Sequence, residues 1–510
     1  MLFSASEGAQ AAALAQLSYA SPFLGERKNL ERLVLGPTFI EGPPLWSRRA
    51  ELAAELDNPN TEQLQGLAER LAARARERLL SGERASAAER QLYEDIVLYV
   101  LYYRYRLRLH DVIQKHIGEK SVRERLAWYP EFVRDGAHFL DLPGQDFVSR
   151  NEWPHLLACF YQVRRAFQFI FQFLTGGSLP AAQLRAATWQ SIFTRDLRRY
   201  LRSLCQRMGD VPTLITGPTG SGKELVARAI SLSRYIPFDP SRLAFTEDFQ
   251  ASFQAVNLAA LSPTLIESEL FGHRRGTFTG AFEDRAGWLE TCGPLGCIFL
   301  DEIGDLDSAI QVKLLRVLQT RSFARLGETT LRTFRGKLIA ATNRDLGAAM
   351  RAGSFRSDLY YRLCADHIET PPLSAQLRAD PRELGSLLRF IAERVANETE
   401  AEGLAGEAEQ WIKENLAADY PWPGNFRELE QCVRSVMVRG EYRPLAAPPS
   451  DASEELARDI AAGALTAEEL LRRYCALLYE RTRNYEETGR RLGLDRRTVK
   501  SKVEAAQREI

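Results

Sequence analysis

The chain has 510 residues, and its composition, 45% hydrophobic and 26% charged, is that of a folded protein and excludes wholesale disorder. Lys and Arg together number 67, and so do Asp and Glu, so no global charge attracts nucleic acid or a membrane, and any such affinity must come from a local patch. At roughly 150 residues per domain, this length predicts three or four structural units.

Seven cysteines are scattered along the chain without a CxxC pair, which favours the reduced thiols of a cytoplasmic protein over disulfides or zinc ligands. The N-terminal stretch MLFSASEGAQAAALAQ lacks the basic segment of a signal peptide, and the most apolar run, AFQFIFQFL, is far too short to cross a membrane. We therefore expect a cytoplasmic protein with no membrane segment.

Residues 1–189 are predicted to form an α-helical regulatory domain, because apolar residues recur at three-to-four spacing in stretches such as TEQLQGLAERLAARARERLL. The region shows neither the alternating β/α pattern nor the acidic strand ends of a phosphoacceptor receiver domain. Aromatic residues on one long predicted helix could line a ligand pocket, but packing in a core or interface is the favoured interpretation. These residues are Tyr93, Tyr99, Tyr102, Tyr103 and Tyr105. The sequence indicates no signal or ligand for this region.

From 190 to 375 the pattern changes to short apolar runs, TLIT, FQAVN, CIFLDE and KLIAATN, separated by helical sequence. This alternation is typical of a parallel α/β domain. Residues 376–442 are predicted to be helical, with the two prolines of YPWPGN enforcing a loop between helices. A linker rich in Pro, Ala and Ser is predicted at 443–464, followed by a small helical unit at 465–510.

A nucleotide site is predicted where the strand TLIT runs into GPTGSGKE and an amphipathic helix follows. Glycines let backbone N–H groups curl around phosphate oxygens, the helix N-terminus adds positive potential, and Lys223 reaches the terminal phosphates. Glu224 stands where the general pattern has a magnesium-binding Ser or Thr, so Mg²⁺ must be held by other groups. The residues of this loop predicted to bind nucleotide are Gly217, Pro218, Thr219, Gly220, Ser221, Gly222, Lys223 and Glu224.

The run CIFLDE ends in two carboxylates, Asp301 and Glu302, at the edge of an α/β sheet where ligands usually bind. Asp301 is the candidate Mg²⁺ ligand, and the adjacent Glu302 can polarise the attacking water. Asn257 and the pair Thr342 and Asn343 also follow predicted strands. Each could contact the γ-phosphate region or the catalytic glutamate, although an asparagine taken alone is more often a turn former.

Six motifs together resemble the AAA+ domain of bacterial sigma-54-dependent transcription activators, over about 190–440: GPTGSGKE, ESELFGHRRGTFTGA, CIFLDEIGDL, KLIAATNRDL, GSFRSDLYYRL and YPWPGNFRELE. A glutamate after the P-loop lysine is usual in that family, which accounts for Glu224. The resemblance implies an ATPase that uses ATP and Mg²⁺, assembles into a ring, expected to be a hexamer, and carries a helical lid at 376–442. It also implies that Asn257 is the switch asparagine, that Thr342 and Asn343 form sensor one, and that Arg427 is sensor two.

In GSFRSDLYYRL, Arg356 and Arg362 resemble the arginine fingers that reach the ATP of a neighbouring subunit. An arginine supplied across an interface stabilises the charge that develops on the transferred phosphoryl group, so hydrolysis requires a ring. Without the surrounding motifs, a surface ion pair with Asp358 would be the default interpretation.

The stretch GTFTGA resembles the loop that reads GAFTGA in this family and contacts the sigma-54 subunit of RNA polymerase when ATP is bound. Glycines at its ends permit backbone turns, and Phe278 offers an apolar tip that is costly to leave in water without a partner. From this hexapeptide alone, a Phe278 that folds back into its own core would be favoured. The predicted sigma-54 contact comprises Gly276, Thr277, Phe278, Thr279, Gly280 and Ala281.

The chain departs from the family pattern at several positions around this loop. Thr277 replaces alanine, Arg274 and Arg275 occupy a position that is commonly Glu-Lys, and RLGETT at 325–330 differs from the RVGG of the second pore loop. GPLGC, before the strand CIFLDE, differs from the usual GGT. These departures lie outside the predicted nucleotide-binding residues, so they bear on how ATP hydrolysis is coupled to polymerase rather than on ATP hydrolysis itself.

Near the C-terminus, YERTRNYEETGRRLGLDRRTVKSKVEAAQ predicts a helix, a turn at Gly493 and a second helix with Asp495 as its N-cap. Residues 481–502 contain eight basic and three acidic residues, a local excess typical of a DNA-binding surface. The segment resembles the Fis-type helix-turn-helix that ends many enhancer-binding proteins, and a solvated helix pair with no DNA role is the alternative. The predicted DNA contacts are Arg496, Arg497, Thr498, Lys500 and Lys502.

The sequence therefore predicts a cytoplasmic AAA+ ATPase that binds double-stranded DNA upstream of a promoter and uses ATP hydrolysis to remodel sigma-54 RNA polymerase. The alternative is an AAA+ ATPase that acts on a different protein through its N-terminal domain, with DNA binding secondary. A nucleotide-dependent DNA-binding switch that does not hydrolyse ATP is disfavoured, because Lys223, Asp301, Glu302 and both arginines are present. The target promoter, and whether the N-terminal domain represses or activates, are not indicated.

Overall fold

The structure, a computed structural model, describes residues 1–41, 58–118, 124–144, 147, 152–250, 253–444, 456, 459–460 and 463–507. The chain divides into two units of packed elements, Met1–Met437 and Val438–Ile510. The linker predicted at 443–464 lies for the most part outside the described residues. Among the helices that are described, none is both long and apolar enough to cross a lipid bilayer.

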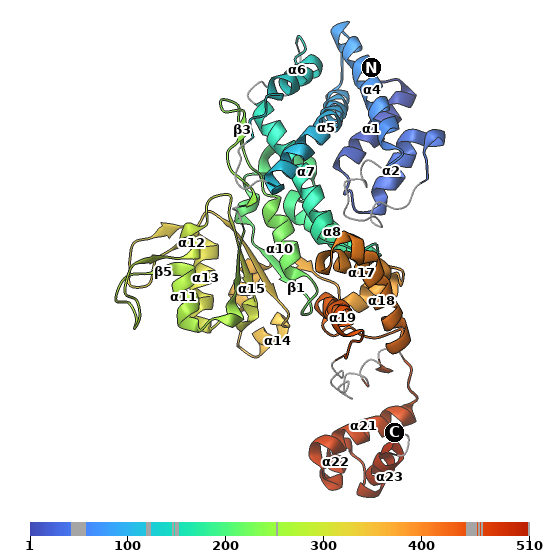
Figure 1. The fold of residues 1–510 in the computed structure, drawn as a ribbon, viewed down its shortest axis with the longest axis vertical. Helices are drawn as coiled ribbons and strands as arrows, with labels where there is room; N and C mark the ends of the chain where they lie inside the picture. Colours follow the sequence, from blue (N-terminus) through green and yellow to red (C-terminus); the bar gives the residue numbers. More distant parts are fainter. Residues whose placement is uncertain are drawn as a thin grey trace. The chain divides into compact units, whose positions relative to one another are not determined.

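The first unit contains a five-stranded parallel sheet with strand order β11-β1-β10-β7-β4 (Figure 1). Its strands are β1 (Thr213–Thr216), β4 (Phe253–Asn257), β7 (Cys297–Asp301), β10 (Lys337–Thr342) and β11 (Asp366–Glu369). Four of them contain the apolar runs predicted from the sequence, and the α/β fold class is confirmed. Because β1 lies between β11 and β10, the loop after β1 leaves the sheet where the strand order reverses, which is where open α/β sheets bind ligands.

The side chains of the sheet alternate between two cores, as the pleat of a strand requires. Leu214 and Leu300 face a core shared with the helices on one side, whereas Ile215 and Phe299 face a core on the other side that includes α10. The helices of this domain are α10 (Lys223–Leu232), α11 (Pro263–Phe271), α12 (Trp288–Thr291), α13 (Ser308–Thr320), α14 (Leu346–Arg351) and α15 (Ser357–Leu363). Three short antiparallel hairpins pair β2 (Phe238–Asp239) with β3 (Ala244–Phe245), β5 (Gly272–His273) with β6 (Arg285–Ala286), and β8 (Ser322–Phe323) with β9 (Arg332–Thr333).

The N-terminal region is helical, as predicted, and its core continues without a break into one face of the sheet. Its helices are α1 (Ala5–Tyr19), α2 (Gly25–Leu35), α4 (Thr61–Leu80), α5 (Ala87–Gly118), α6 (Tyr129–Leu140), α7 (Trp153–Phe173) and α8 (Leu179–Phe193). Figure 1 places α7 and α8 against α10. The short turns α9 (Leu197–Arg199), η4 (Tyr200–Leu204) and η5 (Met208–Asp210) lead from α8 to β1.

Specific contacts join α7 to the end of α10. The guanidinium of the fully buried Arg165 donates to the carbonyl oxygen of Leu232 at 2.9 Å, at the helix C-terminus, where the helix dipole favours a cation. Gln162 donates to the carbonyl oxygen of Ser233, also at 2.9 Å. The ring of Tyr161 stacks on Phe245 of β3, with the ring centres 3.8 Å apart. The N-terminal helices thus cover the sheet as part of its core.

A second helical layer follows the sheet, made of α16 (Leu373–Ala379), α17 (Glu383–Val395), α18 (Glu398–Asn415) and α19 (Asn425–Arg439). The loop predicted at YPWPGN separates α18 from α19. We call these four helices the lid.

The second unit contains α21 (Ala467–Thr482), α22 (Tyr485–Leu492) and α23 (Arg496–Gln507), which pack around Cys475, Val499 and Val503. Gly493 ends α22 with φ +67°, and the Asp495 carboxylate accepts hydrogen bonds from the first turn of α23, as the sequence predicts.

Candidate functional site

The loop predicted to bind phosphate connects β1 to α10. Gly217, Gly220 and Gly222 have φ values of +146°, +75° and +92°, in a region that other residues rarely adopt. A Cβ on Gly217 would lie 2.1 Å from the Thr370 hydroxyl, and one on Gly220 would lie 2.2 Å from the carbonyl oxygen of Gly424 in the lid. The glycines are therefore required by the turn of the loop and by the close approach of its neighbours.

Lys223 begins α10 and is only 7% exposed. Its Nζ donates to the carbonyl oxygens of Gly217 at 3.0 Å and Pro218 at 3.2 Å. Burial lowers the pKa of Lys223, and the nearby carboxylates of Glu302 and Asp301 partly offset that effect. The ammonium group is thus held on the loop, close to the acidic strand end, where it can compensate the charge of a bound anion.

The remaining polar residues of the loop have different surroundings. The Ser221 hydroxyl donates to the carbonyl oxygen of Pro218 at 2.7 Å and lies 2.6 Å from the Thr370 hydroxyl, so it stabilises the loop itself. The Thr219 hydroxyl accepts from Nδ2 of Asn343 at 2.8 Å. Glu224 is exposed in the first turn of α10.

The polar residues predicted after three strands meet at one edge of the sheet. Asn257, at the end of β4, is the register partner of Asp301, at the end of β7. The Glu302 carboxylate accepts from the backbone N–H of Asn343 at 3.5 Å. The buried Thr342 hydroxyl accepts from the backbone N–H of Arg344 at 3.1 Å. The Asn257 side chain caps a short turn, so its amide oxygen has the structural role that the sequence also allowed.

Glu302 has a left-handed backbone, with φ +57° and ψ +48°. A residue with a side chain in this conformation costs about 1–3 kcal/mol, and such strain is concentrated at functional sites. The turn directs the chain from β7 into the short helix η8 (Ile303–Asp305), with the carboxylate near Asn343.

The lid contacts the phosphate-binding loop through the start of α19. Nδ2 of Asn425 donates to the carbonyl oxygen of Thr219 at 2.9 Å. The backbone N–H of Phe426 donates to the carbonyl oxygen of Gly220 at 3.1 Å. The exposed Arg427 follows directly, with its Cβ close to Gly220. Sequence reasoning missed Asn425; its position in a Gly-Asn turn signals a helix start, but nothing in the sequence identifies a partner some 200 residues earlier.

A pocket of about 650 Å³ adjoins this loop at Ser221 and Gly222, and the sequence did not predict it. Most of its lining is apolar. It is contributed by the end of α7, by α8 and by the lid, including Leu174, Leu184, Leu387, Phe390 and Ile391. A mainly apolar pocket beside a phosphate-binding loop is suited to a nucleotide base.

The two predicted arginine fingers lie on the surface at α15. Arg356 forms a two-pronged ion pair with Asp358, with distances of 3.0 and 2.7 Å, which is the local pairing that the sequence also allowed. This pair raises the pKa of Arg356. Arg362 is exposed. Within the described part of the chain, no hydrogen bond or ion pair joins either arginine to Lys223 or Asp301.

The GTFTGA loop projects between β5 and β6, whose pairing closes its base. Gly276 and Gly280 have φ values of +82° and +104°, and the Gly276 N–H donates to the carbonyl oxygen of Ala281 at 2.8 Å. The prediction of glycine-dependent turns is thus consistent with the structure. Thr279 is exposed.

The prediction that Phe278 forms an exposed apolar tip is not what the structure shows. Phe278 is half-buried, and its ring packs edge-on against His273 with the ring centres 5.0 Å apart. The exposed ring of this segment belongs to Phe282, which is 84% accessible. The reason is local, because the left-handed Gly276 and Gly280 fold the loop back toward its own base.

Three of the departures from the family pattern lie in contact with one another. The Thr277 hydroxyl donates to the carbonyl oxygen of Arg274 at 2.5 Å and lies 3.2 Å from the carbonyl oxygen of Leu326, which accepts from the N–H of Arg274 at 3.0 Å. The Arg274 guanidinium also lies 3.8 Å from Glu328. The unusual residues of the GTFTGA loop therefore anchor it to the unusual RLGETT segment.

The predicted DNA-binding residues differ in how free they are to reach a ligand. Lys502 forms an ion pair with Glu468 at 2.8 Å, and its side chain is 23% exposed. Lys500 and Arg496 have looser partners, at 3.7 and 3.4 Å. Thr498 donates to the cap residue at 2.6 Å. Arg497 is exposed and has no ion pair among the residues that the structure describes.

A parallel sheet with a glycine-rich loop and lysine after β1, an acid pair after β7 and a helical lid on the loop defines a nucleotide-binding domain of the AAA+ class. Residues 191–369 match the family described as the Sigma-54 interaction domain. The chain is 38% identical over 302 residues to the transcriptional regulatory protein ZraR of Escherichia coli, covering 58% of this chain and 63% of ZraR.

It is also 38% identical over 269 residues to SfnR of Pseudomonas fluorescens, described as a sigma54-dependent transcriptional regulator, covering 52% of this chain and 68% of SfnR. The chain belongs to the family of sigma-54-dependent transcriptional regulators. It spans less than two thirds of the length of ZraR. Among solved structures, NtrX from Brucella abortus, in complex with ATP, matches 74% of this chain and 79% of its own, with 22% identity and a TM-score of 0.39.

Proposed function

We propose that this regulator hydrolyses ATP in a hexameric ring, binds double-stranded DNA upstream of a promoter, and uses hydrolysis to remodel sigma-54 RNA polymerase in the cytoplasm. The observation that supports it best is the convergence of Lys223, Asp301, Glu302 and Asn343 at one edge of the sheet. Together these residues supply a phosphate-binding cation, two carboxylates and an amide, the groups that phosphoryl transfer requires.

The residues present fit ATP with Mg²⁺. The buried Lys223 is suited to the terminal phosphates, and the Asp301 carboxylate is an oxygen ligand of the kind that Mg²⁺ prefers. When bound, the metal neutralises negative charge on the phosphates. The Glu302 carboxylate would accept a proton from the attacking water, and its hydrogen bond from Asn343 orients it for that role.

The exposed arginines support hydrolysis between subunits. Arg356, the N-cap of α15, and Arg362, in its last turn, are both exposed, so both are available to the nucleotide site of a neighbouring subunit. The ion pair of Arg356 with Asp358 is solvent-exposed, so water screens it and the arginine can exchange partners at little cost.

The GTFTGA loop is the proposed contact with sigma-54. Phe278→Ala and Thr279→Ala are expected to leave ATP turnover within about twofold, because the residues of phosphoryl transfer lie elsewhere. Both variants are expected to abolish promoter opening, because they remove side chains of the proposed sigma-54 contact. Phe282→Ala removes the most exposed ring of the segment. Burying such a ring contributes about 1.5–3 kcal/mol, so promoter opening is expected to fall by about one to two orders of magnitude.

The measurement is the ATPase rate and the yield of open complexes on a sigma-54 promoter, made side by side on the full chain. Val312→Ala, at a 49% exposed apolar position on α13, is the matched control and should affect neither. Normal promoter opening by all three loop variants would remove sigma-54 coupling from this loop and favour a different protein target.

The proposed DNA contact is the exposed start of α23. A double variant, Arg496→Ala with Arg497→Ala, is expected to weaken specific DNA binding by about 1–3 kcal/mol for each arginine that reads a base, with the ATPase rate still measurable. Arg443→Ala, at an exposed arginine outside α21, α22 and α23, is the control for loss of a positive charge and should leave the affinity unchanged. Titrations at several salt concentrations check this, and unchanged affinity in the double variant would exclude α23 as the recognition helix.

A further inference from the structure

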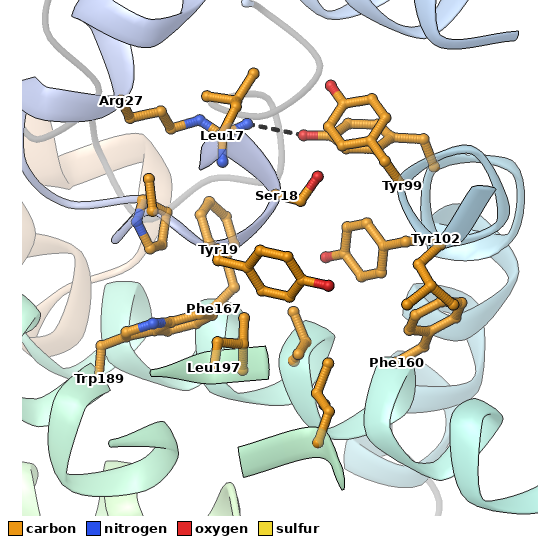
Figure 2. Close-up of a pocket in the computed structure, with 16 residues that line it drawn as sticks. Leu17, Ser18, Tyr19, Arg27, Tyr99, Tyr102, Phe160, Phe167, Trp189 and Leu197 are labelled. Atoms are coloured by element: carbon orange, nitrogen blue, oxygen red, sulfur yellow. Dashed lines mark hydrogen bonds between the residues drawn. The ribbon is translucent and has the colours of Figure 1, made fainter. Parts of the chain in front are cut away.

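A pocket with aromatic walls lies among the N-terminal helices, apart from the nucleotide site (Figure 2). The space between its walls is about 740 Å³, part of which is open to solvent at the mouth. Its walls come from α1, α2, α5, α7, α8 and the segment that leads to β1. Three of the five tyrosines for which core packing was favoured, Tyr99, Tyr102 and Tyr103, line it.

The walls are mainly rings and aliphatic chains. Tyr102 and Phe160 meet edge to face with ring centres 5.6 Å apart, and Phe167 and Trp189 form the side opposite Tyr99 in Figure 2. Rings arranged in this way favour a flat aromatic guest, because offset and edge-to-face contacts add to the energy of burial.

The charged groups around the pocket are already compensated. Nε of Arg27 donates to the Glu31 carboxylate at 3.1 Å, and its Nη2 donates to the Tyr103 hydroxyl at 2.8 Å. Arg198 forms an ion pair with the buried Asp95. A charged guest would therefore lose its hydration without meeting an unpaired opposite charge among the described residues of the pocket, so a neutral guest is favoured.

Two hydroxyl groups that line the pocket, those of Tyr19 and Ser18, already donate their hydrogens to acceptors of the protein. The Tyr19 hydroxyl donates to the Asp95 carboxylate at 2.6 Å, and burial raises the pKa of Tyr19, which keeps that proton in place. The Ser18 hydroxyl donates to the carbonyl oxygen of Leu14 at 2.9 Å. Figure 2 shows both hydroxyls directed into the pocket. Both have used their hydrogens, and the Tyr19 oxygen also interacts with the Arg198 guanidinium, so a guest that bonds to the remaining lone pairs of Tyr19 or Ser18 must supply the donor.

We propose that this pocket is a binding site for a small, neutral aromatic molecule that carries an N–H or O–H donor. The donor lies against the oxygens of Tyr19 and Ser18, and the ring packs among Tyr102, Phe160 and Trp189. The site is made of N-terminal residues together with Leu197 and Leu201, and shares no residue with the proposed ATPase site.

The test uses the full chain and three probes, measured by calorimetric titration: indole, 1-methylindole and indole-3-carboxylate. Indole is expected to bind. The 1-methyl compound, which keeps the ring and loses the donor, should bind about fivefold or more weakly, because a buried acceptor is left unsatisfied. The carboxylate should also bind more weakly. Absence of indole binding at millimolar concentration, or a preference for the carboxylate, would overturn the proposal.

Two variants on α5 locate the binding. Leu98→Trp fills the pocket and is expected to abolish indole binding, whereas Leu107→Trp, at a 45% exposed position on the same helix, should leave it unchanged. Tyr19→Phe keeps the ring and removes one of the two acceptors, so the difference in affinity between indole and 1-methylindole should become smaller. This variant tests the proposal even if Leu98→Trp fails to fold, because an undiminished difference between the two probes would contradict the assigned role of Tyr19.

Discussion

Lys223→Ala is expected to abolish nucleotide binding, whereas Glu302→Gln should bind nucleotide and fail to hydrolyse it. The first change removes a buried ammonium whose hydrogen bonds to phosphate contribute about 1.5–3 kcal/mol each, so the affinity should fall by at least about tenfold. The second keeps the size of the side chain and removes the proton acceptor, which should lower turnover by a factor on the order of 10²–10⁴.

Fluorescent-nucleotide binding and phosphate release, measured on the same preparations, separate the two effects. Lys313→Ala, at a lysine on α13 that pairs with Glu267, is the control for loss of a positive charge and should behave like the unmodified chain. Equal, near-normal turnover in the Lys223 and Glu302 variants would overturn the assignment of the site.

A mixture of two variants tests whether Arg362 of one subunit acts at the nucleotide site of its neighbour. Lys223→Ala chains retain Arg362 but lack a working site, and Arg362→Ala chains retain the site but lack the arginine. A mixture of the two is expected to recover part of the turnover that each lacks alone, because some interfaces then combine both intact parts. A mixture as inactive as its components would place Arg362 outside the neighbouring site.

Removal of the N-terminal helices is expected to destroy the ATPase domain. A fragment of residues 190–510 would expose four aromatic rings, Tyr235, Phe238, Phe245 and Phe249, that pack on rings of α6 and α7. At about 1.5–3 kcal/mol for each ring, the loss is comparable to the whole stability of a typical domain, about 5–15 kcal/mol.

The fragment should therefore aggregate or lack a cooperative unfolding transition, as checked by size-exclusion chromatography and calorimetry. Residues 1–444, which omit the C-terminal helices and leave the shared core whole, are the matched control and should fold. A soluble 190–510 fragment with normal thermal stability would show that the core of the sheet does not depend on α7.

The sequence predicted those parts of the fold and site that depend on neighbours along the chain. The runs that form β1, β7 and β10 are each apolar over a few residues because both faces of these strands are buried, whereas β4, at the edge of the sheet, is only partly buried. A loop of glycines with Lys223 follows β1. The meeting of Asn257 with Asp301 followed from the rule that parallel strands end at one edge.

The parts that the sequence did not predict depend on distant partners. Asn425 contacts Thr219, and Thr277 contacts Leu326, through spacings set by the folded chain rather than by any local pattern. The hexapeptide alone favoured a Phe278 that folds back, and Phe278 is half-buried, but its ring partner His273 lies outside the hexapeptide and could not be identified from it. The continuity of the N-terminal core with the sheet has the same origin, since apolar periodicity shows that a helix face is buried but not which element covers it.

The contact between the lid and the phosphate-binding loop has a consequence for the entropy of ligand binding. The carbonyl oxygen of Thr219 faces the lid, because it accepts from Asn425. In a planar trans peptide the N–H lies opposite the carbonyl, so the N–H of Gly220 is turned away from the lid. The lid thereby fixes the orientation of a phosphate-binding donor before any phosphate arrives. Binding to a loop that is already ordered loses less conformational entropy than binding to a loop that must first be ordered, so the affinity is higher. Through Nδ2 of Asn425, the lid would thus raise the affinity without contacting the nucleotide.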